Sequence, residues 1–169
     1  LCIQKGCAMK IIGIDPGQGG AIACWNKGIT SYKCPQNVET MADIVESFSD
    51  NKKTYAYIEQ VHAMPHDGRS SIFKFGTNYG KWIGILGAYK IETNFVTPQK
   101  WMKYWQNKLD IKLPKDKPSR KRQLKEIASH YTDKKVTLYN ADAILITMYG
   151  LYTEQQGESN DSQRGKSEV

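Results

Sequence analysis

Three acidic residues of this 169-residue chain occupy positions where a carboxylate needs a partner. Asp15 ends one short apolar run, Glu59 ends a second, and Asp142 lies near the start of a third. Each has an ordinary alternative explanation. Asp15 would cap a turn, Glu59 would be a surface glutamate at a strand end, and Asp142 would interact with a helix dipole. However, an isolated carboxylate is costly to bury, so three such positions together favour a shared cation.

These acids would be oxygen ligands. The four cysteines, Cys2, Cys7, Cys24 and Cys34, form no CxxC pair and no Cys/His cluster with zinc spacing, and we interpret them as free thiols. Carboxylates without such partners suit Mg²⁺ or Mn²⁺. Two such ions about 4 Å apart can activate a water and stabilise the leaving oxygen during phosphodiester hydrolysis.

Two parallel strands would bring a pair of these acids to one edge of a sheet. The apolar runs at 10–14 and 54–59 predict strands, and the one-sided apolar pattern at 40–49 predicts a helix between them. Because this helix joins the strands through short connections, the strands should lie parallel. Asp15 and Glu59 would then lie side by side at the carboxyl-terminal edge.

The rest of the chain predicts an α/β fold in one domain. A glycine-rich turn follows the first strand, and the next two apolar segments predict an antiparallel meander. The two meander strands are expected at 21–25 and 28–33, and one further strand at 89–96. Four further helices are expected, at 70–86, from 98 onward, at 119–130 and at 140–152.

Glycines recur along one predicted helix at nearly helical spacing, at Gly76, Gly80, Gly84 and Gly87. Glycine is a poor helix former, so such a row suggests a packing reason. The row predicts a close helix–helix contact, either within the chain or between two copies.

Basic residues are concentrated in one part of the chain. The net charge is +7, and residues 97–135 hold twelve Lys and Arg against four Asp and Glu, so the remainder is about neutral. A basic block beside clustered acids predicts a polyanionic partner, most simply nucleic acid, with a solvated helix face as the alternative. No apolar run approaches the ~20 residues that span a bilayer, so no membrane partner is expected.

Two features of the basic block fit an anionic ligand. Trp101 and Trp105 alternate with lysines, which suits phosphate contacts and base stacking, although both are equally good core residues. Arg120 and Lys121 stand at the start of the helix at 119–130, where positive charge opposes the helix dipole. A docked anion would explain that placement.

Several motifs in this order resemble the RuvC-like Holliday junction resolvases. They are Ile14-Asp15-Pro16-Gly17 with Gly20-Ala21, Ile58-Glu59-Gln60-Val61, Thr97-Pro98-Gln99-Lys100-Trp101 and Ala141-Asp142-Ala143-Ile144-Leu145-Ile146. The stretch from Phe75 to Leu86 and the phrase Lys115-Asp116 … Ser119-Arg120 look most like the branch found in phages and plant chloroplasts. The resemblance covers about residues 10–152.

The resemblance implies a ribonuclease H-like fold, which is a mixed five-stranded sheet flanked by helices. It also implies a homodimer that cuts symmetric strands of a four-way DNA junction in recombination and repair, with no nucleotide cofactor. Asp15, Glu59 and Asp142 match metal-binding catalytic acids, with Mg²⁺ or Mn²⁺ as the cofactor and two ions per site. The glycine-lined helix would belong to the dimer interface.

The resemblance further implies a set of DNA-binding residues. Basic positions that contact DNA in the family correspond to Lys115, Lys117 and Arg120, and Lys100 and Lys121 belong to the same basic block. The loop after Glu59 corresponds to a segment that enters the junction. Its candidates are His62, Met64, His66, Arg69, Phe73 and Phe75, of which Phe73 or Phe75 would wedge between bases unless it belongs to the helix core.

The chain departs from the family pattern at one ligand. The family usually has a further acid or a histidine a few residues before the aspartate that matches Asp142. Here those positions are Leu138, Tyr139 and Asn140. We expect either the amide oxygen of Asn140 or the carboxylate of Asp133 to replace it.

The missing acid keeps other functions open. A resolvase-like dimer that binds branched DNA without cutting it is one alternative, and a ribonuclease H-like nuclease acting on RNA is another. The sequence Asp15-Pro16-Gly17-Gln18-Gly19-Gly20 also fits the phosphate loop of sugar kinases and actin-like ATPases, although those proteins need two such domains.

The expected domain organisation has three parts. Residues 1–8 form a leader, either a non-native remnant or a trimmed presequence, and 9–152 form the nuclease domain. Residues 153–169 have almost no apolar side chains and are predicted to be a disordered tail. A DNA-containing compartment is expected, cytoplasmic in a bacterial or phage-infected cell, or organellar or nuclear, and not a secreted location.

Overall fold

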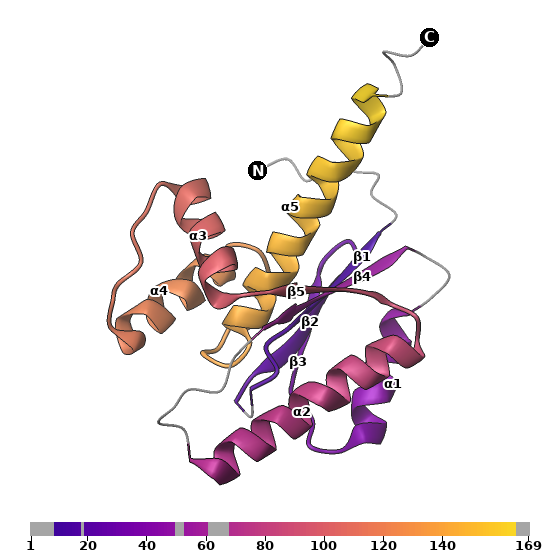
Figure 1. The fold of residues 1–169 in the computed structure, drawn as a ribbon. Helices are drawn as coiled ribbons and strands as arrows, with labels where there is room; N and C mark the ends of the chain where they lie inside the picture. The colour runs from indigo at the N-terminus through magenta and orange to yellow at the C-terminus, as the bar shows by residue number, and fades with distance from the viewer. Residues whose placement is uncertain (1–8, 18, 50–52, 61–67, 165–169) are drawn as a thin grey trace.

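The computed structural model describes residues 9–17, 19–49, 53–60 and 68–164. A mixed five-stranded sheet with the order β3-β2-β1-β4-β5 forms its centre, and helices cover both faces (Figure 1). The strands are β1 (Lys10–Ile14), β2 (Ala21–Trp25), β3 (Ile29–Lys33), β4 (Thr54–Glu59) and β5 (Glu92–Val96). The helices are α1 (Val38–Phe48), α2 (Arg69–Ala88), α3 (Pro98–Leu109), α4 (Lys117–Ser129) and α5 (Ala141–Arg164).

The strand pairing confirms the predicted antiparallel meander and the predicted parallel pair of β1 and β4. β1 pairs antiparallel with β2 and parallel with β4, and β4 pairs parallel with β5. In the parallel register Ile14 lies opposite Ile58, so Asp15 and Glu59 follow directly at the same edge of the sheet. The helix α1 between the two strands makes this parallel crossover possible.

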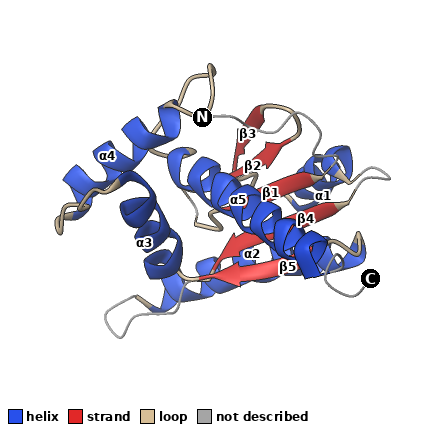
Figure 2. Cartoon of the chain, turned by 90° about the horizontal axis from the view of Figure 1, so that it is seen from above, coloured by secondary structure: helices blue, strands red, loops and turns tan. Residues whose placement is uncertain are grey.

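Side chains alternate between the two faces of the sheet, as expected for buried strands. Ile12 and Ile14 point into a cluster with α1 and α2, whereas Ile11 points into a cluster with α3, α4 and α5. The view from above shows α5 lying across the sheet (Figure 2). Each cluster contains a buried tryptophan from a covering helix, Trp82 on one face and Trp105 on the other.

The helix α5 packs directly on the central strand. A Cβ atom at Gly13 would collide with the backbone and hydroxyl of Thr147 and come within 2.6 Å of the Ala143 carbonyl. One turn further, a Cβ at Gly150 would lie 2.9 Å from a methyl group of Ile11. These two glycines therefore set the height of α5, and thus of Asp142, above the sheet.

The predicted end of the last helix is wrong. The helix α5 continues to Arg164, so residues 153–164 are helical rather than a disordered tail. Poor apolar content does not prevent a helix that grows from a well-packed one, since propagation is much easier than nucleation. The Tyr57 hydroxyl donates a hydrogen bond of 2.6 Å to Glu154, which attaches the first turn of the extension to the sheet.

Smaller differences concern the helix starts. The helix α1 begins at Val38 because Asn37, rather than Thr40, provides the cap, and α4 begins at Lys117 because Asp116 caps it. Thr97 caps α3 as predicted. The described helices include none that is long and apolar enough to cross a membrane. The proposed leader at 1–8 lies outside the described residues.

Candidate active site

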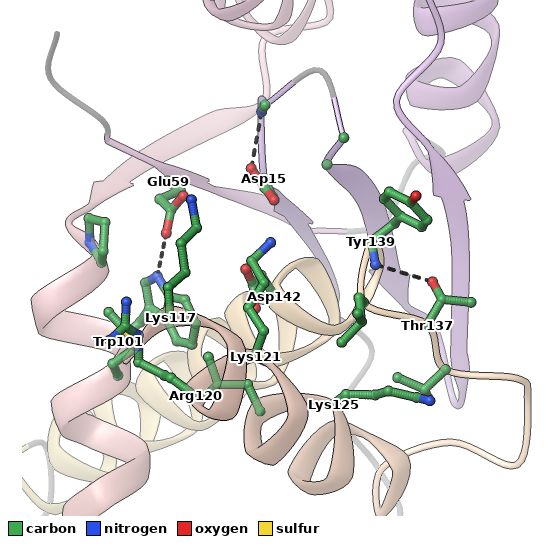
Figure 3. Close-up of a pocket in the computed structure, with 18 of the residues that line it drawn as sticks. Asp15, Glu59, Trp101, Lys117, Arg120, Lys121, Lys125, Thr137, Tyr139 and Asp142 are labelled. Carbon is green, nitrogen blue, oxygen red and sulfur yellow. Dashed lines mark hydrogen bonds between the residues drawn. The ribbon is translucent and has the colours of Figure 1, made fainter. Parts of the chain in front are cut away.

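A pocket of about 790 Å³ opens at the edge of the sheet where β1 and β4 end (Figure 3). The three acids predicted from sequence all line it, and they come from two strand ends and the start of α5. The remaining lining residues come mainly from α4 and from the segment before α5. They are Gly17, Gly19, Gly20, Phe75, Pro98, Trp101, Met102, Lys117, Arg120, Lys121, Leu124, Lys125, Lys135, Val136, Thr137, Leu138 and Tyr139.

Asp15 is held by the glycine turn that follows it. The backbone N–H of Gly17 donates to Asp15 Oδ1 at 3.0 Å, and the backbone N–H of Gly20 donates to the Gly17 carbonyl at 2.9 Å. A Cβ at Gly20 would collide with the Asp15 carbonyl and lie 2.7 Å from Asp15 Cγ. The turn therefore needs glycine at this position to place the carboxylate.

Glu59 is oriented by a tryptophan from α3. The indole N–H of Trp101 donates to Glu59 Oε1 at 2.9 Å (Figure 3). The Trp101 ring is 1% exposed, so it belongs to the core, as does Trp105, whose indole N–H donates to the Leu145 carbonyl. The sequence left open whether these two tryptophans stack on nucleobases or belong to the core. Both belong to the core, and Trp101 also contacts Glu59.

Asp142 stands at the beginning of α5, after a capped turn. The Thr137 hydroxyl accepts from the backbone N–H of Asn140 at 3.4 Å, and Asn140 Oδ1 accepts in return from the Thr137 N–H at 2.7 Å. This reciprocal pair is a capping box, which fixes the first turn of the helix. The helix start in turn positions the Asp142 carboxylate in the pocket.

The three carboxyl groups share one electrostatic environment. Burial raises the pKa of Asp15 above its ordinary value, opposed by the Gly17 N–H and by Lys121. Burial, with repulsion from Asp15 as the next cause, raises the pKa of Glu59 to about 7 and that of Asp142 to about 6. The pocket therefore holds acids that lack sufficient compensating positive charge.

The helix α4 places a row of cations along one side of the pocket that holds these acids. Lys117, Lys121 and Lys125 recur every four residues and line the pocket together with Arg120 and Lys135. Figure 3 shows Lys117 of α4 extending toward Glu59 and Lys121 beside Asp142. The site thus combines an acidic centre with a basic wall.

Not all of the predicted DNA-binding residues meet at the pocket. Lys117, Arg120 and Lys121 line it, as does Phe75. Arg120 also donates to the carbonyls of Pro114 and Lys115 at 3.2 and 2.7 Å, so it shapes the loop before α4. The predicted residues that do not line it are Lys100, Lys115, Arg69 and Phe73, whereas His62, Met64 and His66 lie outside the described residues.

Phe73 is the most exposed of the large apolar side chains in the described part of the chain, at 76%. It stands near the start of α2, one turn after the exposed Arg69. The helix-core alternative for Phe73 is therefore wrong, because its ring is mostly in contact with solvent.

Neither candidate for the fourth ligand lines the pocket. The Asn140 amide oxygen accepts hydrogen bonds from the Thr137 N–H and hydroxyl, and its amide nitrogen donates to Ser31 Oγ at 3.0 Å. Asn140 does not line the pocket. Asp133, the alternative, is exposed and is absent from the pocket lining as well. The amide oxygen of Asn140 is thus used for capping, and its amide nitrogen ties the turn to β3.

Sequence reasoning missed several lining residues. The four-residue spacing of Lys117, Lys121 and Lys125 is visible in the sequence and could have added Lys125. Lys135 and Tyr139 precede α5 in an irregular segment, and no local pattern identifies them.

The donor set fits a hard divalent cation. Asp15, Glu59 and Asp142 offer only oxygen, which is the ligand that Mg²⁺ and Mn²⁺ prefer. Within the described ranges, no three His, Cys, Asp or Glu side chains are already close enough together to form a complete ligand cluster. A bound cation would also relieve the repulsion that raises the pKa of Glu59.

The sheet order and the helices on both faces define a ribonuclease H-like fold, as the resemblance implied. Two structures of RuvC from Thermus thermophilus superpose on it with a TM-score of 0.57 each. One, in complex with Holliday junction substrate, is 14% identical and covers 88% of this chain and 96% of its own. The other is 13% identical and covers 88% and 97%. At these identities the likeness shows that the chain has the fold of RuvC.

A structure of the yeast mitochondrial Holliday junction resolvase Ydc2 superposes less closely, with a TM-score of 0.45. It is 14% identical and covers 84% of this chain and 75% of its own. No protein-family model and no curated protein sequence matches the chain.

Proposed function

We propose that this protein is a metal-dependent endonuclease that cuts four-way DNA junctions. The observation that carries the proposal is the meeting of Asp15, Glu59 and Asp142 in one pocket beside the basic face of α4. An acidic centre within a basic wall suits hydrolysis of a phosphodiester in a nucleic acid. The junction as substrate is supported by the shared fold with T. thermophilus RuvC, which is known in complex with Holliday junction substrate. A DNA-containing compartment follows from this substrate.

The roles of the residues follow from their positions. Asp15, Glu59 and Asp142 would hold two Mg²⁺ or Mn²⁺ ions, which when bound stabilise the negative charge that develops on the phosphate during hydrolysis. Trp101 keeps Glu59 Oε1 in place through its indole N–H. Lys117 and Lys121 attract and hold the DNA backbone, because they face the pocket from the start of α4.

A homodimer would provide two such sites for the two strands. In the single chain a Cβ at Gly76, Gly80, Gly84 or Gly87 would meet no atom within 4 Å, so the glycine row of α2 has no packing partner within the described part of the chain. Close approach of a second α2 would explain these glycines. Phe73 and Arg69, exposed at the start of the same helix, would then stand near the centre of the junction.

A second candidate function is binding of branched DNA without cleavage. The absence of a fourth acid from the described lining of the pocket favours it. Asn140 could have supplied a fourth oxygen ligand, but its amide oxygen caps the turn before α5 instead. The two candidates differ in catalysis and not in the DNA that they bind.

Cleavage of labelled junctions separates the two candidates. The full chain is incubated with a four-way junction, a duplex and a single strand of the same sequence, in Mg²⁺, Mn²⁺ or EDTA. We expect nicks only in the junction and only with metal. Asp15→Asn should abolish nicking while junction binding persists. Binding without nicks in either metal would support the second candidate, and absence of junction binding would overturn both.

A further inference from the structure

An exposed aromatic ring lies at the mouth of the pocket, and no role proposed above uses it. Tyr139 lines the pocket and is 55% exposed, although large apolar rings are normally covered. The other aromatic rings of the lining are more enclosed, since Trp101 is buried in the core and Phe75 is half-buried. Figure 3 shows Tyr139 across the pocket from Trp101.

The backbone presents this ring rigidly. Tyr139 lies inside the capping box that Thr137 and Asn140 form before α5, and its own N–H donates to the Thr137 hydroxyl at 3.3 Å. Asn140 additionally donates to Ser31 of β3, which ties the turn to the edge of the sheet. Little backbone freedom would be lost when a ligand contacts the ring, so binding to it costs little entropy.

The ring also stands beside the catalytic turn. A Cβ at Gly19 would lie 3.6 Å from Tyr139 Cδ1 and 3.7 Å from Cε1, so the ring edge packs against the turn that carries Asp15. The ammonium of Lys33 lies 5.4 Å from the ring centroid, a cation–π distance. Lys135, four residues before Tyr139, lines the same pocket.

These observations describe an accessible aromatic ring with the Lys33 ammonium over one face, and with Lys135 and the three acids lining the same pocket. Nucleobases stack on such surfaces while neighbouring cations hold the backbone phosphates. Because the ring contacts the turn of Asp15, the base concerned must belong to a nucleotide next to the phosphate that is cut. Stacking of this kind needs no particular base, since every base has an aromatic face.

We infer that Tyr139 is a stacking platform for the base adjacent to the cleaved phosphate, with Lys33 holding the flanking backbone. This inference rests on the proposed junction-cleaving function. It assigns to Tyr139 a positioning role: the ring aligns the strand with the acids and takes no part in proton transfer.

The test compares four variants in junction binding and cleavage. Tyr139→Phe keeps the ring and should behave like the wild-type chain. Tyr139→Leu keeps apolar bulk without a ring, and Tyr139→Ala removes both. We expect each of these two to lower single-turnover cleavage or junction affinity about 5- to 150-fold, the range for loss of one stacked base. Tyr32→Ala removes an exposed tyrosine that packs near Phe48, away from the pocket, and should have little effect on cleavage.

A double-mutant cycle locates the base. Junctions carry one abasic site at each position around the cut, and each is tested with the wild-type chain and with Tyr139→Ala. At the position of the stacked base, the abasic site should reduce cleavage by the wild-type chain as much as Tyr139→Ala reduces cleavage of the intact junction. The variant and the abasic site combined should reduce cleavage no more than either change alone. At other positions the effects should be additive.

The outcomes separate this inference from the proposed function. If the wild-type chain cuts junctions and Tyr139→Leu matches Tyr139→Phe, the stacking platform is overturned while the nuclease stands. Additive effects at every abasic position would overturn it too. If the wild-type chain does not bind junctions, the proposed function fails first. Thermal unfolding of each variant shows whether the fold is retained. We expect it to be retained, because the Tyr139 side chain is exposed and substitutions of exposed side chains change stability little.

Discussion

At the scale of single residues, the site is controlled by how the carboxylates are held and how strongly they repel one another. Each acid has its own local support, namely the glycine turn for Asp15, the Trp101 indole for Glu59 and the capped start of α5 for Asp142. Burial raises the pKa of all three, and repulsion from Asp15 raises those of Glu59 and Asp142 further. The isolated chain therefore carries a destabilising charge cluster that a divalent cation would relieve.

Replacing Trp101 with phenylalanine tests how Glu59 is held. Loss of the indole N–H removes a hydrogen bond that lowers the pKa of Glu59, so this pKa should rise further above about 7. A hydrogen bond to a charged group, worth about 1.5 kcal/mol, corresponds to about one pH unit. We expect the acidic limb of the pH–rate profile to move up by up to that amount, and the Mg²⁺ requirement to rise.

Trp105→Phe is the matched control, because it deletes an equally buried indole N–H that donates to the Leu145 carbonyl, away from the acids. It should lower stability without moving the pH profile. Equal profiles for Trp101→Phe and Trp105→Phe would contradict the role given to Trp101.

The raised pKa of Glu59 also predicts how stability depends on pH. Because the pKa of Glu59 is about 7 in the folded chain and 4.5 ordinarily, the folded state binds the proton more tightly. The stabilising contribution is complete below pH 4.5 and is lost as the pH rises through 7. Metal-free Glu59→Gln should therefore exceed the wild-type chain in unfolding free energy by about 1–3 kcal/mol at pH 8, and match it near pH 4.5.

Urea unfolding in EDTA at the two pH values measures this difference. Addition of Mg²⁺ at pH 8 should stabilise the wild-type chain and have much less effect on Glu59→Gln. Glu126→Gln, which changes an exposed glutamate of α4, should alter neither result. A Glu59→Gln variant that is less stable than the wild type at pH 8 would show that burial and repulsion do not disfavour the Glu59 carboxylate in the folded chain.

At the scale of elements, α5 connects the core to the site. Its first turn carries Asp142, its middle packs on β1 through Gly13 and Gly150, and its last turns extend beyond the domain that the sequence predicted. The helix α4 performs the complementary task, since its lysines at four-residue intervals form one wall of the pocket. The site is thus made of a rigid acidic side and a basic helix opposite it.

Two glycines of α5 give a matched pair of substitutions. A Cβ at Gly150 would lie 2.5 Å from the ring of Tyr57, whereas a Cβ at Gly157 would meet nothing within 4 Å. Both changes gain helix propensity, but Gly150→Ala must also push the helix away from the sheet. We expect Gly150→Ala to lower the unfolding free energy by about 1–3 kcal/mol and Gly157→Ala to raise it by up to about 1 kcal/mol.

Chemical denaturation of the two variants measures both effects. Destabilisation by Gly157→Ala would indicate that residues beyond Tyr152 are not helical in solution. An unchanged stability for Gly150→Ala would contradict the close packing of α5 on β4.

At the scale of the whole molecule, the functional proposal needs two copies. The acids lie at the carboxyl-terminal edge of the sheet, and the basic helix α4 packs with α3 and α5 on one face. The glycine row belongs to α2, which packs with α1 on the other face. Figure 1 shows α2 beside α1 on that side of the sheet. One surface is therefore available for DNA and another for a second chain.

Replacement of Gly84 by leucine tests the dimer. The side chain would occupy the glycine row, so it should separate the copies without disturbing the single chain, where nothing lies within 4 Å. We expect light scattering to show a dimer for the wild-type chain and a monomer for Gly84→Leu. Paired nicks on opposite strands should be replaced by fewer, unpaired nicks.

The same substitution at Gly157, an exposed helical glycine outside α2, is the control and should leave the assembly intact. A monomeric wild-type chain at working concentration, or a Gly84→Leu variant that still dimerises, would contradict the interface on α2.

Much of the fold and the centre of the site could be predicted from the sequence, because both depend on local patterns. Short apolar runs that end in Asp15 and Glu59, joined by an amphipathic helix, predict parallel strands whose ends meet, and the sheet confirms this. The position of Asp142 at a helix start follows from a similar local pattern. Apolar periodicity is read over a few residues, so distant contacts are not needed to detect it.

Only the tertiary structure shows which polar atoms remain available for chemistry. Asn140 had the right chemical type for a metal ligand, but its oxygen is used by Thr137 and its nitrogen by Ser31 of another element. Trp101 reaches Glu59 across 42 positions of sequence, and Tyr139 enters the pocket from an irregular turn. Hydrogen bonds and exposure depend on neighbours that are distant in the chain, so they can be assigned only after the elements have packed.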